Sequence, residues 1–203
     1  MTRTVRTRGR PRSTEADDAI LEAAVELLIE RGVEATSIER VANRAGVTRP
    51  TIYRRYTDKT TLLIAAIHHA YPAPPDQLPE PRDTEEMLAW WAQGLSGDTG
   101  DRTAGRTRQL LRRLMISLHD HPELEEAFTE ASIEPRNRWI RAVLARDRER
   151  GRFPADTDLE IVQEILTGAV TTHLLTRPDD SSPQEIEEFL LAVLRVTRYR
   201  KES

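Results

Sequence analysis

The residues of this chain that are best suited to chemistry lie between positions 40 and 59, where six basic side chains accompany a single acidic one, Asp58. Arginine and lysine neutralise phosphate groups, and arginine can also donate two hydrogen bonds to the edge of a guanine. Hydroxyl side chains stand among these cations, and such groups bind phosphate oxygens without distinguishing one base pair from another. The segment therefore predicts contact with a nucleic acid.

Side-chain type divides the candidate DNA contacts into two groups. Arginine and threonine reach base edges, and proline packs against a thymine methyl group. The candidates for base contact are Arg49, Pro50, Thr51 and Arg54. The candidates for contact with the DNA backbone are Thr36, Ser37, Thr48, Tyr53 and Lys59, and Arg44 is a further candidate DNA contact. An alternative stays open for Thr36 and Thr48, which also suit helix caps, and for Arg55, which suits a solvated face. Tyr56 is expected in the core.

The chain opens with a basic arm, residues 1–13. The first 14 residues hold five arginines and no acidic residue, although arginine is the usual cation throughout the chain. Three of the five alternate with a glycine and a proline, and such a sequence suits a narrow minor groove. These three are Arg8, Arg10 and Arg12. A flexible, solvated tail is the alternative for the same residues.

Net charge is unevenly distributed along the chain. The whole sequence has a formal charge of −4. Residues 1–59 carry 12 basic and 9 acidic residues, a net of +3, whereas the remainder carries 18 and 25, a net of −7. An acidic body with a basic end is expected of a protein that contacts a polyanion at one place.

Composition excludes several kinds of site and several classes of protein. Cysteine is absent, so disulfides, thiolate metal sites and a cysteine nucleophile are excluded. No stretch approaches the roughly 18 consecutive apolar residues of a membrane span, and no signal peptide is evident. We expect a cytoplasmic protein without membrane contact, cofactor or metal ion.

Caps and apolar periodicity predict four helices in a domain from residue 14 to residue 70. The first helix ends at Gly32, and the second begins with a capping box formed by Thr36 and Glu39 and runs to about residue 45. Gly46 permits a sharp turn, and Pro50 then lies in the first turn of a third helix that lasts to about residue 56. Asp58 caps the fourth helix. The second and third helices form a helix-turn-helix.

The remainder of the chain, residues 71–203, is predicted to be a second, larger helical domain. It begins with a connector, residues 72–82, whose five prolines exclude helix. Apolar spacing then predicts helices over 85–95, 106–119, from Pro122 onward, over 137–150 after a break or kink at Pro135, and over 158–175 and 184–197. The predicted fold is all-α, with about nine helices.

Residues 36–63, TSIERVANRAGVTRPTIYRRYTDKTTLL, resemble the DNA-binding domain of the TetR family of transcriptional regulators. The matching positions are Thr36, Ile38, Val41, Ala42, Ala45, Gly46, Val47, Thr48, Tyr53, Tyr56, Lys59 and Leu62. The resemblance implies that Thr48, Tyr53 and Lys59 contact phosphate, and that Arg49, Pro50, Thr51 and Arg54 face bases. It covers about residues 14–70, and the rest of the chain agrees in helix number and length.

The resemblance also implies a homodimer that binds double-stranded DNA at a palindromic operator, and a cavity in the second domain for a small-molecule effector. We therefore expect a repressor that the effector releases from DNA. The last two helices are expected to pair with those of a second copy through Leu166, Leu174, Phe189, Leu190 and Val193. The cavity is expected near Trp91, Leu118, His119, Trp139 and Val170, although ordinary core packing explains each of these residues equally well.

Two other functions are open from the residues alone. A nonspecific architectural protein would use the same basic residues without selecting a DNA sequence. A metal-dependent enzyme would use His119, Asp120 and His121, but these residues precede Pro122 at an expected helix end, where histidines suit the helix dipole. Sequence motifs of phosphate-binding loops, serine hydrolases and zinc proteases are absent. We therefore expect no enzymatic activity.

Overall fold

The computed structural model describes residues 11–70, 78–96 and 104–201, and every regular element within those ranges is a helix. The prediction of an all-α fold is confirmed. No helix in these ranges combines the length and the apolar character that spanning a membrane requires.

The first helix, α1 (Pro11–Ala35), packs against α2 (Ile38–Ala45) and α4 (Lys59–Ala70). It begins at Pro11, inside the predicted arm, because proline fits the first turn of a helix. Gly32 has a φ of 76°, a left-handed value that favours glycine, and it interrupts the regular helix as predicted.

The start of α2 differs from the prediction. Ser37 is the N-cap residue, and its hydroxyl accepts a hydrogen bond from the N–H of Arg40 at 3.3 Å. Thr36 is buried, and its hydroxyl donates to the carbonyl of Gly32 at 2.8 Å. The predicted capping box of Thr36 and Glu39 is therefore wrong, because the Thr36 side chain closes the end of α1 instead.

The third helix, α3 (Arg49–Tyr53), is shorter than predicted, and α4 follows it closely. The carboxylate of Asp58 accepts the N–H of Thr61 at 2.7 Å, which confirms the predicted cap and lowers the pKa of Asp58. Apolar residues of α1 to α4 form one core, and this core continues into α6 (Ala104–Ser117) and α7 (Pro122–Phe128). The two predicted domains therefore share packed side chains.

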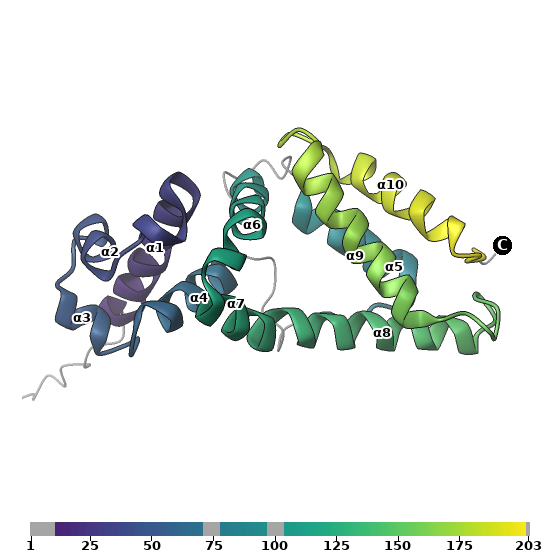
Figure 1. The fold of residues 1–203 in the computed structure, drawn as a ribbon, viewed down its shortest axis with the longest axis horizontal. Helices are drawn as coiled ribbons and strands as arrows, with labels where there is room; N and C mark the ends of the chain where they lie inside the picture. Colours follow the sequence, from purple (N-terminus) through teal and green to yellow (C-terminus); the bar gives the residue numbers. More distant parts are fainter. Residues whose placement is uncertain (1–10, 71–77, 97–103, 202–203) are drawn as a thin grey trace, which may run out of the picture.

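Beyond residues 78–83, which are not helical, the larger part of the chain begins with α5 (Thr84–Leu95). The helices after α7 are α8 (Glu134–Glu149), α9 (Leu159–Thr176) and α10 (Pro183–Val196). Figure 1 shows α1 to α4 at one end of the molecule, α6 and α7 beside them, and α5, α8, α9 and α10 at the other end. A second core lies among α5, α8, α9 and α10.

The chain does not break at Pro135, where the sequence predicts a break or a kink. A π turn, Thr129–Ile133, joins α7 to α8 with helical dihedral angles on both sides, and Figure 1 shows the two helices as one rod. Proline has no N–H for the carbonyl four residues earlier, and a π turn lets a helix absorb such a change in hydrogen bonding. If α7 and α8 are counted as one helix, the described residues form nine α-helices, which agrees with the predicted number of about nine.

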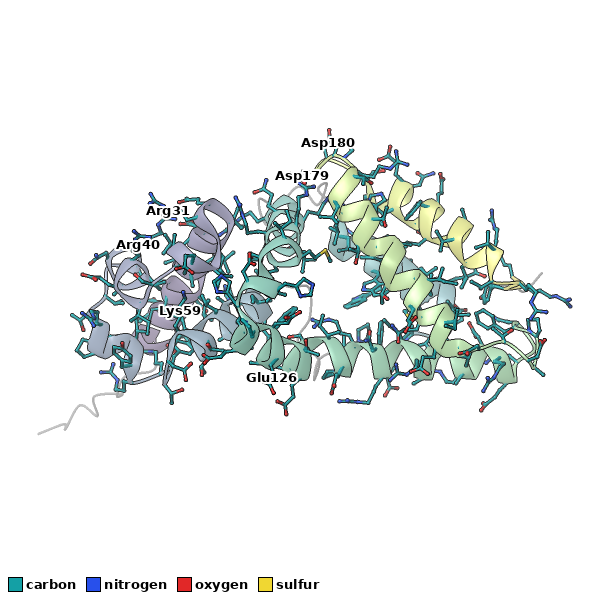
Figure 2. All side chains as sticks on the ribbon, viewed as in Figure 1. Arg31, Arg40, Lys59, Glu126, Asp179 and Asp180 are labelled. Atoms are coloured by element: carbon teal, nitrogen blue, oxygen red, sulfur yellow. The ribbon has the colours of Figure 1, made fainter. Side chains whose placement is uncertain are left out.

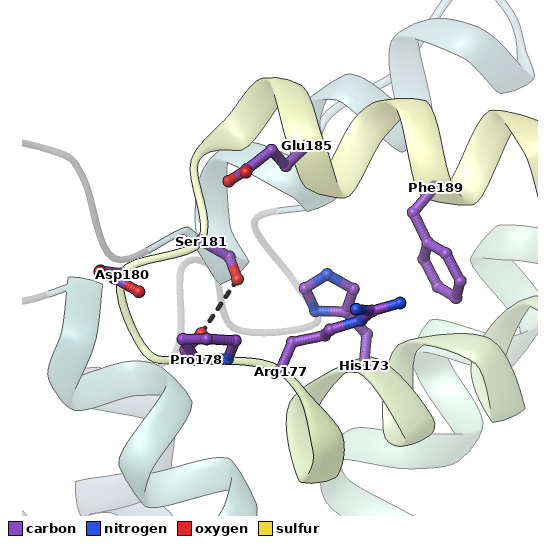
Figure 3. Close-up of a pocket in the computed structure, with 7 residues that line it drawn as sticks. All are labelled: His173, Arg177, Pro178, Asp180, Ser181, Glu185 and Phe189. Atoms are coloured by element: carbon purple, nitrogen blue, oxygen red, sulfur yellow. Dashed lines mark hydrogen bonds between the residues drawn. The ribbon is translucent and has the colours of Figure 1, made fainter.

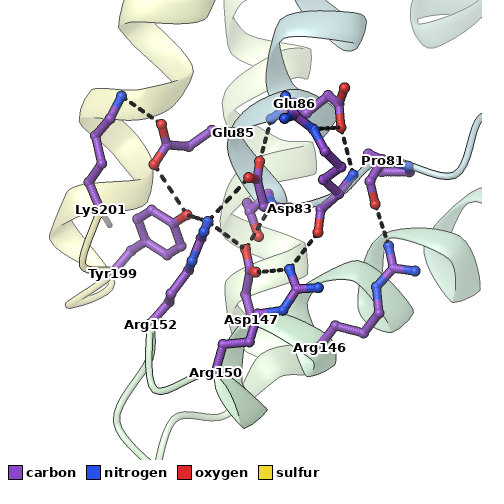
Figure 4. A network of polar contacts seen from close by, with 12 residues as sticks. Pro81, Asp83, Glu85, Glu86, Arg146, Asp147, Arg150, Arg152, Tyr199 and Lys201 are labelled. Carbon is purple, nitrogen blue, oxygen red and sulfur yellow. Dashed lines mark hydrogen bonds and ion pairs between the residues drawn. The ribbon is translucent and has the colours of Figure 1, made fainter. Parts of the chain in front are cut away.

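A polar cluster closes the far end of the second core (Figure 4). Asp147 has no exposed surface, and its carboxylate accepts the N–H of Thr84 at 2.8 Å and lies 3.8 Å from the guanidinium of Arg152. Arg152 also donates to the hydroxyl of Tyr199 at 3.1 Å, and burial raises the pKa of Tyr199 to about 12. These four residues, the Asp147 clasp, hold together the start of α5, the end of α8 and the C-terminal segment.

Candidate functional site

The turn between α2 and α3 orients a helix-turn-helix. Gly46 has φ 67° and ψ 27°, and the N–H of Val47 donates to the carbonyl of Ala42 at 3.0 Å. Thr48 is extended, and α3 starts at the next residue. Ile52 has no exposed surface and anchors the inner side of α3 on the core. The opposite side of α3 is left open.

That open side carries the residues predicted to face bases, together with two of those predicted to bind phosphate. We call it the α3 surface, and it consists of Thr48, Arg49, Pro50, Thr51, Tyr53 and Arg54. Tyr53 is 49 % exposed, and the hydroxyls of Thr48 and Thr51 are hydrogen-bonded at 2.9 Å. The structure therefore brings cations, hydroxyls and a phenol onto one short, accessible helix.

The other basic side chains of residues 40–59 are held by contacts within the helix-turn-helix part. The partners are the Ala35 carbonyl for Arg40, the Glu30 carboxylate for Arg44, the Asp17 carboxylate for Arg55 and the Val33 carbonyl for Lys59. Within the described residues, Arg49 and Arg54 make no side-chain hydrogen bond or ion pair. The two cations of the α3 surface are therefore the ones left to bind an external group.

Two of the predicted DNA contacts, Arg44 and Lys59, have partners within the protein. Arg44 lies 2.8 Å from the Glu30 carboxylate and 3.6 Å from that of Glu26, so it ties α2 to α1. Lys59 donates to the Val33 carbonyl at 2.8 Å, and burial lowers its pKa while the Glu34 carboxylate opposes that shift. These internal partners hold both cations beside α1, at the base of the helix-turn-helix.

The remaining predicted DNA contacts are those of Thr36, Ser37 and the arginines of the arm. The Thr36 side chain is 1 % exposed, so its predicted phosphate contact is wrong. Ser37 is half-buried, and its hydroxyl is occupied by the cap of α2. Arg8 and Arg10, and the side chain of Arg12, lie outside the described residues.

Figure 2 labels three basic and three acidic side chains on the ribbon. The labelled bases Arg31, Arg40 and Lys59 lie on the helix-turn-helix part, whereas the labelled acids lie on α7 and on the turn between α9 and α10.

The second part of the molecule contains two adjoining cavities. The α7 cavity, of about 240 Å³, is lined by Leu111, Leu114, Met115, Leu118, Glu125, Phe128, Thr129, Ile133, Arg136, Val170 and Leu174. The α5 cavity, of about 250 Å³, is lined by Trp91, Met115, Ile133, Arg136, Asn137, Ile140, Thr167, Val170 and Thr171. Apolar walls with a few polar groups are typical of sites for small organic molecules.

Some of the residues predicted to lie at the cavity line it, and others do not. Trp91, Leu118 and Val170 line the two cavities. His119 does not, because its side chain is 84 % exposed and pairs with Glu125 at 2.7 Å. The described lining does not include Trp139 either, whose indole N–H donates to the Pro79 carbonyl at 2.8 Å. Both predictions are wrong for the same reason, since these side chains turn away to other partners.

Sequence reasoning missed the polar groups of the cavities, above all Arg136. It is 7 % exposed, and it lies on the same stripe of α8 as the buried residues Ile140, Val143 and Asp147. A charged residue at a core position of a helical stripe was the signal that would have found it.

A third cavity, of about 320 Å³, lies at the turn between α9 and α10 (Figure 3). Charged groups of both signs line it, among them Arg177, Asp180 and Glu185. Burial lowers the pKa of His173 in its wall, and Arg108 and Arg177 act in the same direction. This lining is polar, which distinguishes the pocket from the α7 and α5 cavities.

The predicted dimer residues fall into two groups. Leu166, Leu174 and Leu190 are at most 1 % exposed within their own chain, so they offer no surface to a second copy and that part of the prediction is wrong. Phe189 and Val193 are half-buried. The exposed large apolar side chains of α9 and α10 are Ile161, Ile165, Leu175 and Val196. Periodicity identified both helices but not which of their faces is turned outward.

The described residues hold no group of three or more acidic or histidine side chains placed to bind a metal ion. His119 pairs with Glu125, and His121 lies 4.0 Å from the Glu34 carboxylate on α1. These two histidines are therefore directed to different partners.

Comparison with known proteins identifies both parts of the chain. The family described as "Bacterial regulatory proteins, tetR family" matches residues 20–66, and the family described as "Tetracyclin repressor-like, C-terminal domain" matches residues 92–193. The chain belongs to the TetR family. This TetR-family member is therefore a DNA-binding, helix-turn-helix regulator of transcription.

Bacterial relatives match most of the TetR-family chain. The HTH-type transcriptional regulator AqdR of Rhodococcus erythropolis is 27 % identical over 190 residues, which are 91 % of this chain and 88 % of that protein. The uncharacterized HTH-type transcriptional regulator YdeS of Bacillus subtilis is 23 % identical over 186 residues, 91 % of this chain and 90 % of that protein.

Solved structures share the fold. NalD, the secondary repressor of the MexAB-OprM multidrug efflux pump in Pseudomonas aeruginosa, has a TM-score of 0.69 at 26 % identity, covering 94 % of this chain and 100 % of that chain. A TetR-family regulator from Rhodococcus sp. has a TM-score of 0.71 at 18 % identity, covering 91 % and 98 %, and that likeness concerns the fold alone.

Proposed function

We propose that this TetR-family member is a repressor that binds a palindromic operator as a homodimer and leaves it when a small molecule fills the α7 and α5 cavities. In this proposal residues 14–70 bind DNA, aided by the basic arm, and residues 71–203 bind the effector and the second copy. The protein acts in the cytoplasm and has no enzymatic activity.

The observation that carries the proposal is that the cations around α3 form two groups. One group is held by partners within the protein, and the other is exposed. The other four basic side chains of residues 40–59 are held by internal partners, while Arg49 and Arg54 project from the α3 surface. Arginines without internal partners on a protruding helix suit guanine edges in a major groove.

The homodimer rests on α9 and α10. The exposed positions Ile161, Ile165, Gly168 and Leu175 follow one face of α9, and a Cβ added at Gly168 would meet no atom within 4 Å. A face with large apolar side chains and an open glycine suits close packing of a second helix. Two copies related by a two-fold axis would present two α3 surfaces to successive major grooves, about 34 Å apart.

Sequence selection from a pool of random DNA duplexes tests this function. We expect the full chain to enrich a palindrome whose half-sites are about one helical turn apart. A nonspecific architectural protein would enrich no motif, because phosphate contacts carry no sequence information. Enrichment of a single half-site without symmetry would contradict the homodimer. It would still agree with sequence-specific contacts to bases.

A further inference from the structure

Arg136 is the charged residue that the two effector cavities have in common. Four residues line both spaces, namely Met115, Ile133, Arg136 and Val170. Three of these are apolar, and the fourth carries a guanidinium with five N–H donors. Arg136 is 7 % exposed, so its charge faces the interior rather than bulk water. A ligand that spans the cavities therefore passes this cation.

The groups around Arg136 define the chemistry of that ligand. Among the described residues that line the α5 cavity, Arg136 alone carries a charge, and Asn137, Thr167 and Thr171 supply neutral polar groups. The α7 cavity also has Glu125, but this carboxylate pairs with the exposed His119 at 2.7 Å. A buried guanidinium gains most from a carboxylate, which accepts two parallel hydrogen bonds.

We propose that the effector is an amphipathic organic carboxylate, whose charged end pairs with Arg136 and whose apolar part fills the α7 and α5 cavities. The proposal rests on the effector-binding role given above and names the chemical class of the effector. A cationic ligand would be repelled by Arg136, and a neutral ligand would form weaker hydrogen bonds to it than a carboxylate does.

Arg136 also connects the cavities to the DNA-binding part. Its Nη1 donates to the carbonyl of Ser132 in the π turn at 3.3 Å, and the Ser132 hydroxyl lies 2.5 Å from Nε2 of His68 on α4. A carboxylate that binds the same guanidinium competes with the Ser132 carbonyl. Its arrival therefore alters the π turn at the point where that turn contacts α4.

Calorimetric titration of the full chain tests the carboxylate class with matched probes. Decanoate and naphthoate are the anionic probes, decanol and naphthylmethanol are their neutral counterparts, and decylammonium is the cationic counterpart of decanoate. We expect one of the carboxylates to bind at least about tenfold more tightly than its alcohol, the gain of a charge-assisted pair. Decylammonium is expected to bind more weakly than decanol.

Variants locate the charge that the carboxylate recognises. Arg136→Met should remove the roughly tenfold preference while leaving alcohol binding within about threefold, and Arg136→Lys should retain part of the preference. Arg138→Met is the matched control, because Arg138 lies on the same helix, is exposed and pairs with Glu134. It should behave as the wild type.

Three results would overturn the proposal. The first is that the alcohols bind the wild type as tightly as the carboxylates or more tightly. The second is that the preference for a carboxylate survives Arg136→Met or disappears in Arg138→Met. The third is that neither carboxylate binds the wild type at millimolar concentration. The comparison of probes on the wild type stands even if Arg136→Met fails to fold. A carboxylate that binds through Arg136 but leaves operator affinity unchanged would support this inference and contradict the proposed release from DNA.

Discussion

The hydroxyl of Ser132 lies 2.5 Å from Nε2 of His68, and this contact joins the π turn between α7 and α8 to the DNA-binding part. Ser132 is buried, and its neighbour Ile133 lines both the α7 cavity and the α5 cavity. His68 lies on α4, whose first residue, Lys59, closes the end of α1. One side-chain pair thus connects the walls of the cavities to the base of the helix-turn-helix.

Removing the Ser132 hydroxyl should weaken the coupling between ligand and DNA. In Ser132→Ala, we expect carboxylate affinity to change by less than about twofold, while the factor by which the ligand lowers operator affinity falls by about two- to thirtyfold. Fluorescence anisotropy of a labelled operator, with and without the tighter-binding carboxylate, measures that factor. Ser117→Ala is the control, because the Ser117 hydroxyl donates within its own helix. An unchanged factor in Ser132→Ala would exclude this route.

The Asp147 clasp should dominate the stability of the second core. Asp147→Ala leaves the Thr84 N–H and the Arg152 guanidinium without this carboxylate, so we expect a loss of about 3–5 kcal/mol in the free energy of unfolding. Asp156→Ala removes an exposed ion pair with Arg198 and should cost at most about 1 kcal/mol. Urea denaturation followed by circular dichroism compares the two. Similar losses would show that the clasp contributes no more than a surface pair.

The exposed apolar face of α9 should be the dimer interface. Ile165 is 40 % exposed there, and a charge at that position would be buried between two copies. We expect Ile165→Glu to sediment as a monomer and to lose tight operator binding. Ile116→Glu changes another exposed isoleucine, on α6, and should remain a dimer. The interface is placed wrongly if Ile165→Glu sediments like the wild type.

His173 should lower the free energy of unfolding as the pH becomes acidic. Burial lowers its pKa from the ordinary 6.5, and Arg108 and Arg177 add to the shift. Below about pH 6.5 the unfolded chain binds a proton that the folded protein does not, so stability present above that pH is lost as the pH falls towards the folded pKa. We expect His173→Gln to flatten this slope by at most about 1.4 kcal/mol per pH unit.

Denaturation curves collected between about pH 7.5 and about pH 5 measure this slope. Ser117→Ala serves as the control, because it removes no titratable group and the Ser117 hydroxyl donates within its own helix. Parallel curves for His173→Gln and the wild type would contradict the assignment.

Local signals in the sequence predicted the helix-turn-helix well. Gly46 is required for a left-handed turn, Pro50 suits the first turn of α3 and Asp58 caps α4, and each effect depends on residues close in the chain. Thr36 shows the limit of such signals. Thr36 and Ser37 both suit a cap, and only the packing of the Thr36 side chain against the end of α1 decides between them.

Contacts between distant segments were not predictable in the same way. Arg136 meets the cavities because α6, α8 and α9 converge around it, and Leu166 is buried because the packing of the second core turns it inward. A single sequence gives the period of an apolar stripe but not the partner that covers each side of it. The same reasoning explains why His119 was placed in the cavity, although its side chain is exposed.

The affinity of the full chain for its selected operator, compared with a scrambled duplex of equal composition, tests the central claim most directly. We expect a preference of at least about 10³ at physiological salt. Arg49→Ala should lower that preference by about five- to 150-fold, whereas Arg44→Ala, whose side chain pairs with Glu30, should retain it. Equal affinity for the two duplexes, or the same preference in Arg49→Ala, would contradict sequence-specific binding through the α3 surface.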